Sequence, residues 1–336
     1  MKVFKFTSRL LLIILLLTIV IISCNSENNF RKCYVSYENK DFNGKEKFTI
    51  YVQNKINPIY YFGFEVSHEQ DTSDLVYSNQ YRLQKGLIYE FDGKSMQYVG
   101  LTVLSTGESE CVYRTSNKVD FTGGIHGDEQ LIEVNFYIDS IQLSSTELDQ
   151  NFYLKPCEEF AYIQKSNMYE SLENGKAINS NRIVEAVHIK RSVFKNSGYE
   201  TYNRLNWKKK SVIETAYMSI SSISVDVGEF CQTNSSEICI LDRSSDFKCK
   251  GTGNSLRIWN DSNGLSALIN SEFSLNNNSA IQFIWDRPNY TKYYRNLVFD
   301  DPELKEVGEI WQSNNPFKVN EGDIWESNTS ILFLME

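Results

Sequence analysis

An alternation of apolar and polar residues with a period of two constrains the fold of this chain most, and it recurs along most of the sequence. It is clearest over residues 47–52, 131–138, 183–194 and 219–227. Such alternation is typical of strands that bury one face, because successive side chains point to opposite sides of a sheet. Stripes at helical spacing are scarce, and we expect only a turn or two of helix near residues 145–150. The pattern predicts an all-β fold, a large antiparallel β-sandwich of jelly-roll or super-sandwich type.

The sequence offers one candidate domain boundary, a polar stretch over residues 165–182. This stretch either separates two sandwiches or forms a long loop across one. Neither half repeats the other, which favours one large sandwich over residues 31–336.

Composition narrows the classes of function. The chain has 336 residues, of which 41% are hydrophobic, and this excludes a disordered protein. The formal net charge is -9. Nucleic-acid binding and loose electrostatic attachment to membranes both depend on basic surfaces, so the acidic balance argues against both.

Residues 1–23 have the layout of a secretory signal, with three basic residues among the first nine and an apolar run over residues 10–22. The run is too short to cross ~30 Å of hydrocarbon. It ends in the letters IISC, which resemble the lipobox of bacterial lipoproteins. The resemblance implies cleavage before Cys24, lipidation of Cys24 and a polar tether over residues 24–30. An ordinary signal peptide with a chance cysteine is the alternative.

A lipid anchor would place the protein in the cell envelope, at the outer membrane or the cell surface. Disulfides are stable in that compartment. Of the possible pairs we expect Cys231 with Cys239, because a turn sequence lies between them. Buried free thiols are the alternative. No cysteine or histidine spacing indicates a zinc site, and we expect neither a metal nor a cofactor. Six cysteines remain after Cys24, namely Cys33, Cys111, Cys157, Cys231, Cys239 and Cys249.

A glycine-rich loop directly before the strand at residues 131–138 is the most informative site. It reads FTGGIHGDE over residues 121–129. Three glycines let the backbone adopt positive φ and approach a ligand closely. His126 is suited to general acid or base catalysis near neutral pH, and Asp128 or Glu129 would orient it or act beside it. The alternative is a hairpin whose histidine only hydrogen-bonds the loop.

A second candidate site lies in the strand at residues 182–194. Alternation puts His188 and Lys190 on one face and Glu185 on the other. Polar side chains in the middle of a sheet face indicate either a groove that binds polysaccharide or an ordinary solvated face. Downstream, Tyr202 and Trp207 either stack on sugar rings or pack in the core. The basic run at residues 208–210 is either a turn or a contact for an acidic glycan.

The motif Gly-Gly-X-His-Gly at residues 123–127, with Glu185 and the segment around Tyr217, resembles β-sandwich proteins of phage tails and bacterial export that are associated with surface glycans. In architecture the chain resembles the large sandwiches of polysaccharide lyases and sugar mutarotases. The Gln-X-His signature of jelly-roll alginate lyases is absent from it. The resemblance implies a carbohydrate partner.

We therefore expect an enzyme that acts on an extracellular polysaccharide, as a lyase or as a glycoside hydrolase. In a lyase, His126 or Tyr217 would take the C5 proton while Arg114 or Lys190 neutralises the uronate. In a hydrolase, Asp128 or Glu129 would work with Glu185 across about 5 to 9 Å. A non-catalytic glycan-binding lipoprotein and a structural adhesion protein are the alternatives, the former using the same polar and aromatic residues.

The lipobox generates the first prediction. Replacing Cys24 with alanine removes the only thiol that a lipobox would acylate, so the protein should be released from membranes or remain unprocessed. Fractionation and the mass of the mature N-terminus measure this. Normal processing with retention in the membrane fraction would contradict the anchor.

Overall fold

The computed structural model describes the chain from residue 32 onward with internal gaps. The described residues are 32–72, 77–105, 109–116, 118, 121–170, 182–224, 226–233, 238–240, 252–253, 255–275, 278–279, 283–284, 294–295, 302–310 and 317–336. The signal, Cys24, the tether and Cys249 lie outside them. Residues 32–336 belong to one compact unit. No helix in the described residues is both long and apolar enough to span a bilayer.

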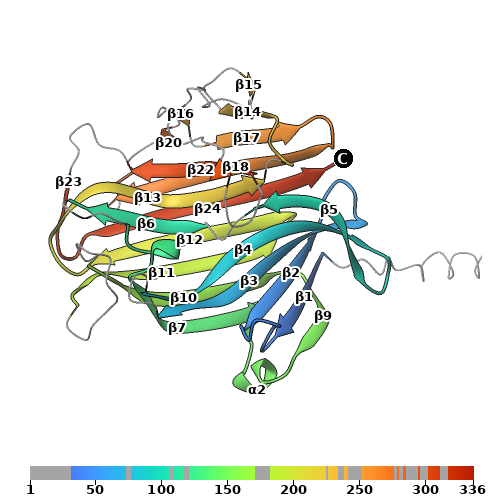
Figure 1. Cartoon of the computed structure of the whole chain (residues 1–336), viewed down its shortest axis with the longest axis horizontal. Helices are drawn as coiled ribbons and strands as arrows, with labels where there is room; N and C mark the ends of the chain where they lie inside the picture. Colours follow the sequence, from blue (N-terminus) through green and yellow to red (C-terminus); the bar gives the residue numbers. More distant parts are fainter. Residues whose placement is uncertain are drawn as a thin grey trace, which may run out of the picture. The chain divides into compact units, whose positions relative to one another are not determined.

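The described unit is a β-sandwich, as the alternation predicts, and its strands pair antiparallel with one exception (Figure 1). The first layer is a meander that continues onto a long strand with partners on both edges. In spatial order it contains β9 (Phe152–Cys157), β1 (Cys33–Glu38), β2 (Lys47–Gln53), β3 (Tyr60–Thr72), β4 (Tyr77–Phe91), β5 (Met96–Leu104) with β6 (Glu110–Thr115), β13 (Ser211–Ser224), β22 (Pro302–Ile310) with β23 (Phe317–Val319), and β21 (Tyr294–Arg295).

The second layer is built around the strand farthest along the chain, which lies between two strands from much earlier in the sequence. In spatial order it contains β8 (Ile141–Gln142), β7 (Glu129–Ile138), β10 (Phe160–Tyr169), β11 (Val184–Lys195), β12 (Gly198–Trp207), β24 (Ile324–Met335), β18 (Leu265–Leu275), β17 (Ser255–Asn260), β14 (Phe230–Thr233) and β15 (Cys239–Ile240). Strand β19 (Asn278–Ser279) pairs with the end of β18, and β16 (Thr252–Gly253) pairs with β20 (Phe283–Ile284).

One short parallel pairing joins the two layers. Residues Ser78 and Asn79 of β4 pair with Glu129 and Gln130 of β7. Strand β10 pairs with β7 on one edge and with β11 on the other, so the chain before and after residues 165–182 contributes to the same layer.

Helix is confined to two short segments of the described residues, η1 (Gly124–His126) and α2 (Ser145–Leu148). The predicted turn of helix at residues 145–150 is thus confirmed. Its capping box explains why it forms: the Ser144 hydroxyl accepts from the Glu147 amide, and the Glu147 carboxylate accepts from the Ser144 amide at 3.0 Å.

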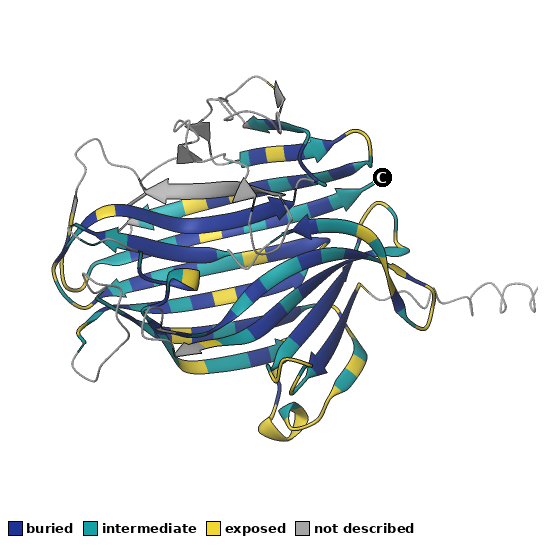
Figure 2. Ribbon diagram, in the orientation of Figure 1, coloured by how far each residue is buried: buried dark blue, intermediate teal, exposed yellow. Residues whose placement is uncertain are grey.

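The main core lies between the layers and is rich in aromatic rings. Phe48 of β2 is fully buried and crosses the interface, with its ring centroid 4.5 Å from that of Phe136 on β7 and 5.0 Å from that of Phe160 on β10. Phe64 likewise meets Phe194 of β11 at 5.5 Å. Figure 2 shows that burial extends along both faces of β13, whose second half has no exposed residue.

A second apolar cluster, which includes Trp207, Trp325 and Met218, lies at the other end of the same strands. Between the two clusters the inward side chains of the second layer are polar, and we call this the polar belt. One row of it runs in register across four neighbouring strands. The belt consists of Gln164, Ser166, His188, Lys190, Ser192, Thr201, Asn203, Ser271, Ser327 and Thr329, all of them buried except the half-buried Thr201.

The core geometry gives the second prediction. Replacing Phe48 with alanine should lower the free energy of unfolding by about 3 to 5 kcal/mol, because a fully buried ring leaves a cavity between the layers. The matched control is Phe42→Ala, since Phe42 is 93% exposed, and its cost should stay within about 0.5 kcal/mol. Urea unfolding followed by circular dichroism measures both. Equal effects of the two variants would contradict this assignment of the core.

Candidate functional site

The glycine-rich loop lies where β6, β7 and β4 come together, and its glycines are required by close approach. Gly123, Gly124 and Gly127 all have positive φ, at 101°, 58° and 81°. A Cβ on Gly124 would lie 2.3 Å from the carboxyl carbon of Glu110, and one on Gly123 would lie 2.7 Å from the Cys111 carbonyl oxygen. No side chain fits in either place, so the expected positive φ is present and the close approach is to neighbouring groups of the same chain.

Buried side chains hold this loop from beneath. The Glu110 carboxylate accepts the Ile125 amide at 2.6 Å, and Glu129 accepts the Gly124 amide at 3.3 Å. The Gln80 side-chain amide donates to the Gly124 carbonyl at 2.8 Å. Glu110, Gln80 and Glu129 are 5%, 3% and 1% exposed. The backbone that carries His126 is therefore fixed by groups that water does not reach.

The His126 ring lies above this support at the surface, in a cluster centred on Phe121. The ring centroids of His126 and Tyr217 lie 5.2 and 5.3 Å from that of Phe121. The Arg114 guanidinium carbon lies 5.2 Å from the same centroid, in cation–π geometry. We call His126, Phe121, Tyr217 and Arg114 the His126 cluster. The structure thus brings together three of the predicted site residues.

Access to the His126 cluster differs from residue to residue. Tyr217 is 7% exposed, whereas the side chain of Arg114 keeps 30% of its surface in solvent. The Arg114 Nε lies 3.4 Å from a Glu214 oxygen, and the Glu214 side chain is 47% exposed. A partly exposed ion pair of this kind contributes little stability. The Arg114 side chain reaches solvent in part, although its Nε atom is buried.

Glu129 and His188 form a second constellation, inside the polar belt. His188 Nδ1 lies 2.8 Å from Glu129 Oε1, and its Nε2 lies 3.2 Å from Asn203 Oδ1. The Ser166 hydroxyl also donates to Glu129. Burial would raise the pKa of Glu129, but His188, Ser166 and the Gly124 amide together hold it below its usual value.

The partners of Asn203 determine what His188 must donate. Asn203 Nδ2 donates to the Met218 carbonyl at 3.1 Å, so its Oδ1 faces His188. Both ring nitrogens of His188 thus lie within hydrogen-bonding distance of a side-chain oxygen. Because Met218 belongs to β13, this chain of hydrogen bonds also crosses from the second layer to the first.

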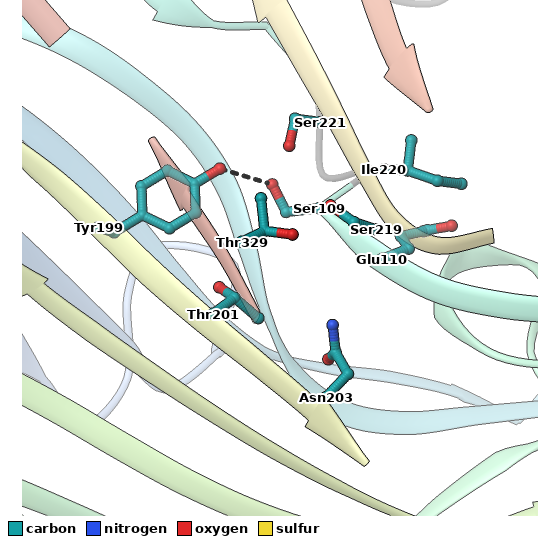
Figure 3. A pocket seen from close by; sticks show the side chains of 9 residues that line it. All are labelled: Ser109, Glu110, Tyr199, Thr201, Asn203, Ser219, Ile220, Ser221 and Thr329. Atoms are coloured by element: carbon teal, nitrogen blue, oxygen red, sulfur yellow. Dashed lines mark hydrogen bonds between the residues drawn. The ribbon is translucent and has the colours of Figure 1, made fainter. Parts of the chain in front are cut away.

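A small cavity opens where Asn203 meets the first layer (Figure 3). Its volume is about 10 Å³, which is the space one water molecule needs. The Tyr199 and Ser109 hydroxyls lie 3.4 Å apart at one side. A sugar ring does not fit, but a single hydroxyl-sized group does. The cavity is lined by Ser109, Glu110, Tyr199, Thr201, Asn203, Ser219, Ile220, Ser221 and Thr329.

The carboxylates proposed for hydrolysis are occupied by internal partners. Asp128 is paired with Arg182, and Glu129 with His188. Glu185, on the opposite face of β11 from His188, accepts from the Ser211 hydroxyl at 2.9 Å and lies 3.4 Å from Lys209 Nζ. Burial raises the pKa of Glu185 despite these two partners. No open carboxylate pair results among these residues.

The burial and partners of four further predicted residues bear on their assignments. Trp207 is 1% exposed and packs on Tyr113 and Trp325, so a role in stacking on sugar is wrong and core packing is correct. Lys190 is 5% exposed and donates to the Ser109 carbonyl at 3.1 Å, so neither it nor His188 lies on a solvated face. Tyr202 is half-buried and hydrogen-bonded to Glu326.

The residues that sequence analysis missed are those that support the loop. Glu110, Gln80, Ser166 and Asn203 come from four different strands and share no local pattern. Phe121 is the exception, because it is an aromatic residue beside the glycine motif and could have been recognised. In the described residues no group of three or more potential metal ligands occurs.

Comparison with known proteins adds little to this geometry. No protein-family model matches the chain, and no curated protein matches it. A solved structure described as "Crystal Structure Analysis of HI1317" is similar over 84% of this chain and 99% of that one, at 11% identity and a TM-score of 0.30. A likeness this weak carries no argument, so the functional conclusion depends on the chain's own residues.

The buried pair generates the third prediction. Replacing Glu129 with glutamine should lower the free energy of unfolding at pH 7 by about 3 to 5 kcal/mol, because it leaves His188 buried beside a neutral amide. Because the pKa of Glu129 is lowered in the folded protein, its carboxylate stabilises the fold at pH values above its ordinary pKa of 4.5. This stabilisation is lost as the pH falls through the lowered pKa. The variant should therefore lose less stability than the wild type as the pH falls below about 5 in urea unfolding.

Glu185→Gln is the matched control, because that carboxyl is also buried but has a raised pKa. A carboxyl with a raised pKa stabilises the fold less as the pH rises, because it ionises while buried. The free energy of unfolding of the Glu185→Gln variant should therefore increase relative to that of the wild type as the pH increases. Identical pH profiles of the two variants would contradict the assigned roles.

Proposed function

We propose that this protein is an exported, lipid-anchored protein of the cell envelope that binds an acidic polysaccharide through the His126 cluster. The observation that carries the proposal is the gathering of His126, Tyr217 and Arg114 around Phe121, on a loop fixed by buried carboxylates. The lipobox-like sequence supports the anchor, and the resemblance to glycan-associated sandwiches supports the type of partner.

The chemistry of the cluster favours a uronic acid unit over a neutral sugar. A guanidinium binds carboxylates with paired, charge-assisted hydrogen bonds, and Arg114 is exposed enough to make them. His126 is half-buried, and an imidazole is a side chain that can hydrogen-bond a sugar hydroxyl or a carboxylate. The fixed loop keeps the ordering cost of binding low.

Elimination by a lyase is the second candidate, favoured by the presence of a histidine and a tyrosine beside the same cation. His126 would accept the C5 proton, and Arg114 would neutralise the adjacent carboxylate. The electrons of the C5–H bond would form the C4–C5 double bond, and the leaving O4 would take a proton from Tyr217. Hydrolysis has less support, because Asp128, Glu129 and Glu185 are engaged internally.

The fourth prediction separates binding from catalysis. His126→Ala and Arg114→Ala should each weaken binding to oligouronates by about 1 to 3 kcal/mol, measured by calorimetry. If the protein is a lyase, His126→Ala should also lower the rate of formation of unsaturated product by at least about 100-fold, measured by ultraviolet absorbance.

The matched controls are His68→Ala and Arg257→Ala. His68 stacks on Tyr81, and Arg257 lies 4.8 Å from the Trp259 ring centroid, a cation–π contact outside the His126 cluster. Both controls should bind like the wild type, and all four variants must melt like it. If His126→Ala and Arg114→Ala melt normally but keep full affinity and activity, the binding site is elsewhere.

A further inference from the structure

Cys33 and Cys157 face each other across two neighbouring strands. Cys33 begins β1, Cys157 ends β9, and the two are direct partners in the antiparallel register. Both are present as thiols, 0% and 5% exposed, and their side chains are in hydrogen-bonding contact. Cys111, by contrast, contacts the Met218 sulfur.

This placement meets the geometric requirement for a covalent bond. Directly opposed residues of antiparallel strands have Cα atoms about 4.5 to 5.5 Å apart. Disulfides occur at Cα separations of about 4.4 to 6.8 Å. We propose that Cys33 and Cys157 form a disulfide in the exported protein. The predicted partners Cys231 and Cys239 are also opposed in register, but that pair closes only a short hairpin.

The bond would form by thiol–disulfide exchange with an oxidised dithiol protein of the envelope. Two S–H bonds are lost and one S–S bond is gained in this chain, while the two electrons and two protons reduce the oxidant's disulfide to two thiols. Burial raises the pKa of Cys33, so its reactive thiolate is scarce after folding. The exchange therefore takes place while β1 and β9 are still pairing. The oxidising compartment rests on the export proposed above.

The position of the bond explains what it would do. In the described residues β9 pairs only with β1. The ladder between these two strands shifts register between Val35 and Tyr37, and Pro156 has no backbone amide to donate to it. Cys33 is the second described residue, close in sequence to the proposed tether. A disulfide there would fasten this edge strand at the place where tension from a lipid anchor enters the fold.

Peptide mass mapping tests the bond directly. The full chain is isolated from the envelope fraction without reductant, its free thiols are alkylated under denaturing conditions, and its peptides are compared before and after reduction. A linked Cys33–Cys157 peptide pair that disappears on reduction is the expected result. Full alkylation of both cysteines, in this sample and after refolding with oxidised glutathione, would overturn the proposal.

Melting measurements give a second readout. In a Cys231→Ser, Cys239→Ser background, reductant should lower the melting temperature by roughly 5 °C or more, because the bond closes a loop of over 100 residues. Adding Cys33→Ser should abolish this response, whereas the matched Cys111→Ser should keep it. A response that persists in the Cys33→Ser variant would assign the effect to another pair.

Fractionation keeps this proposal distinct from the proposed function. A chain that stays in the cytoplasm, yet forms the bond when refolded with oxidised glutathione, would refute export and support the pairing. A chain in the envelope fraction with both thiols free would support export and refute the pairing.

Discussion

The buried pair between Glu129 and His188 connects the parts of this molecule that matter for function. Glu129 ends the glycine-rich loop and begins β7, and its two oxygens reach in different directions, one to His188 and one to the Gly124 amide. Through Asn203 the same hydrogen-bonded chain reaches the Met218 carbonyl in the opposite layer. One carboxylate thus determines both how the layers meet and where the loop with His126 lies.

Burying Glu129 and His188 together requires free energy of desolvation, and this requirement explains the residues around them. A buried ion pair often stabilises a protein no more than apolar residues of similar volume would. Here the apolar alternative is present on both sides, because one aromatic cluster lies at each end of the polar belt. The belt contributes directed hydrogen bonds that apolar packing lacks, and two of its members, His188 and Ser166, hold the Glu129 carboxylate that accepts the Gly124 amide.

Much of the fold could be predicted from the sequence because the signals are local. Alternation located strands β2, β7 and β11 to within about two residues, and the short helix α2 lies within the predicted residues 145–150. Glycine content identified the loop. Alternation alone, however, does not distinguish an inward polar side chain from an outward one, so His188 and Lys190 could be read as solvated. The roles of Glu110 and Asn203 depend on strands distant in sequence, and no local pattern reports them.

The placement of β24 has a consequence for the order of assembly. This strand, formed by residues 324–335, separates β12 from β18 in the middle of the second layer and supplies Ser327 and Thr329 to the polar belt. Strands β12 and β18 can be joined in one layer only after β24 has been synthesised, and pairing over large sequence distances is slow. The ribosome therefore completes nearly all of the described chain before the second layer can close, so this layer is completed late in synthesis or after it.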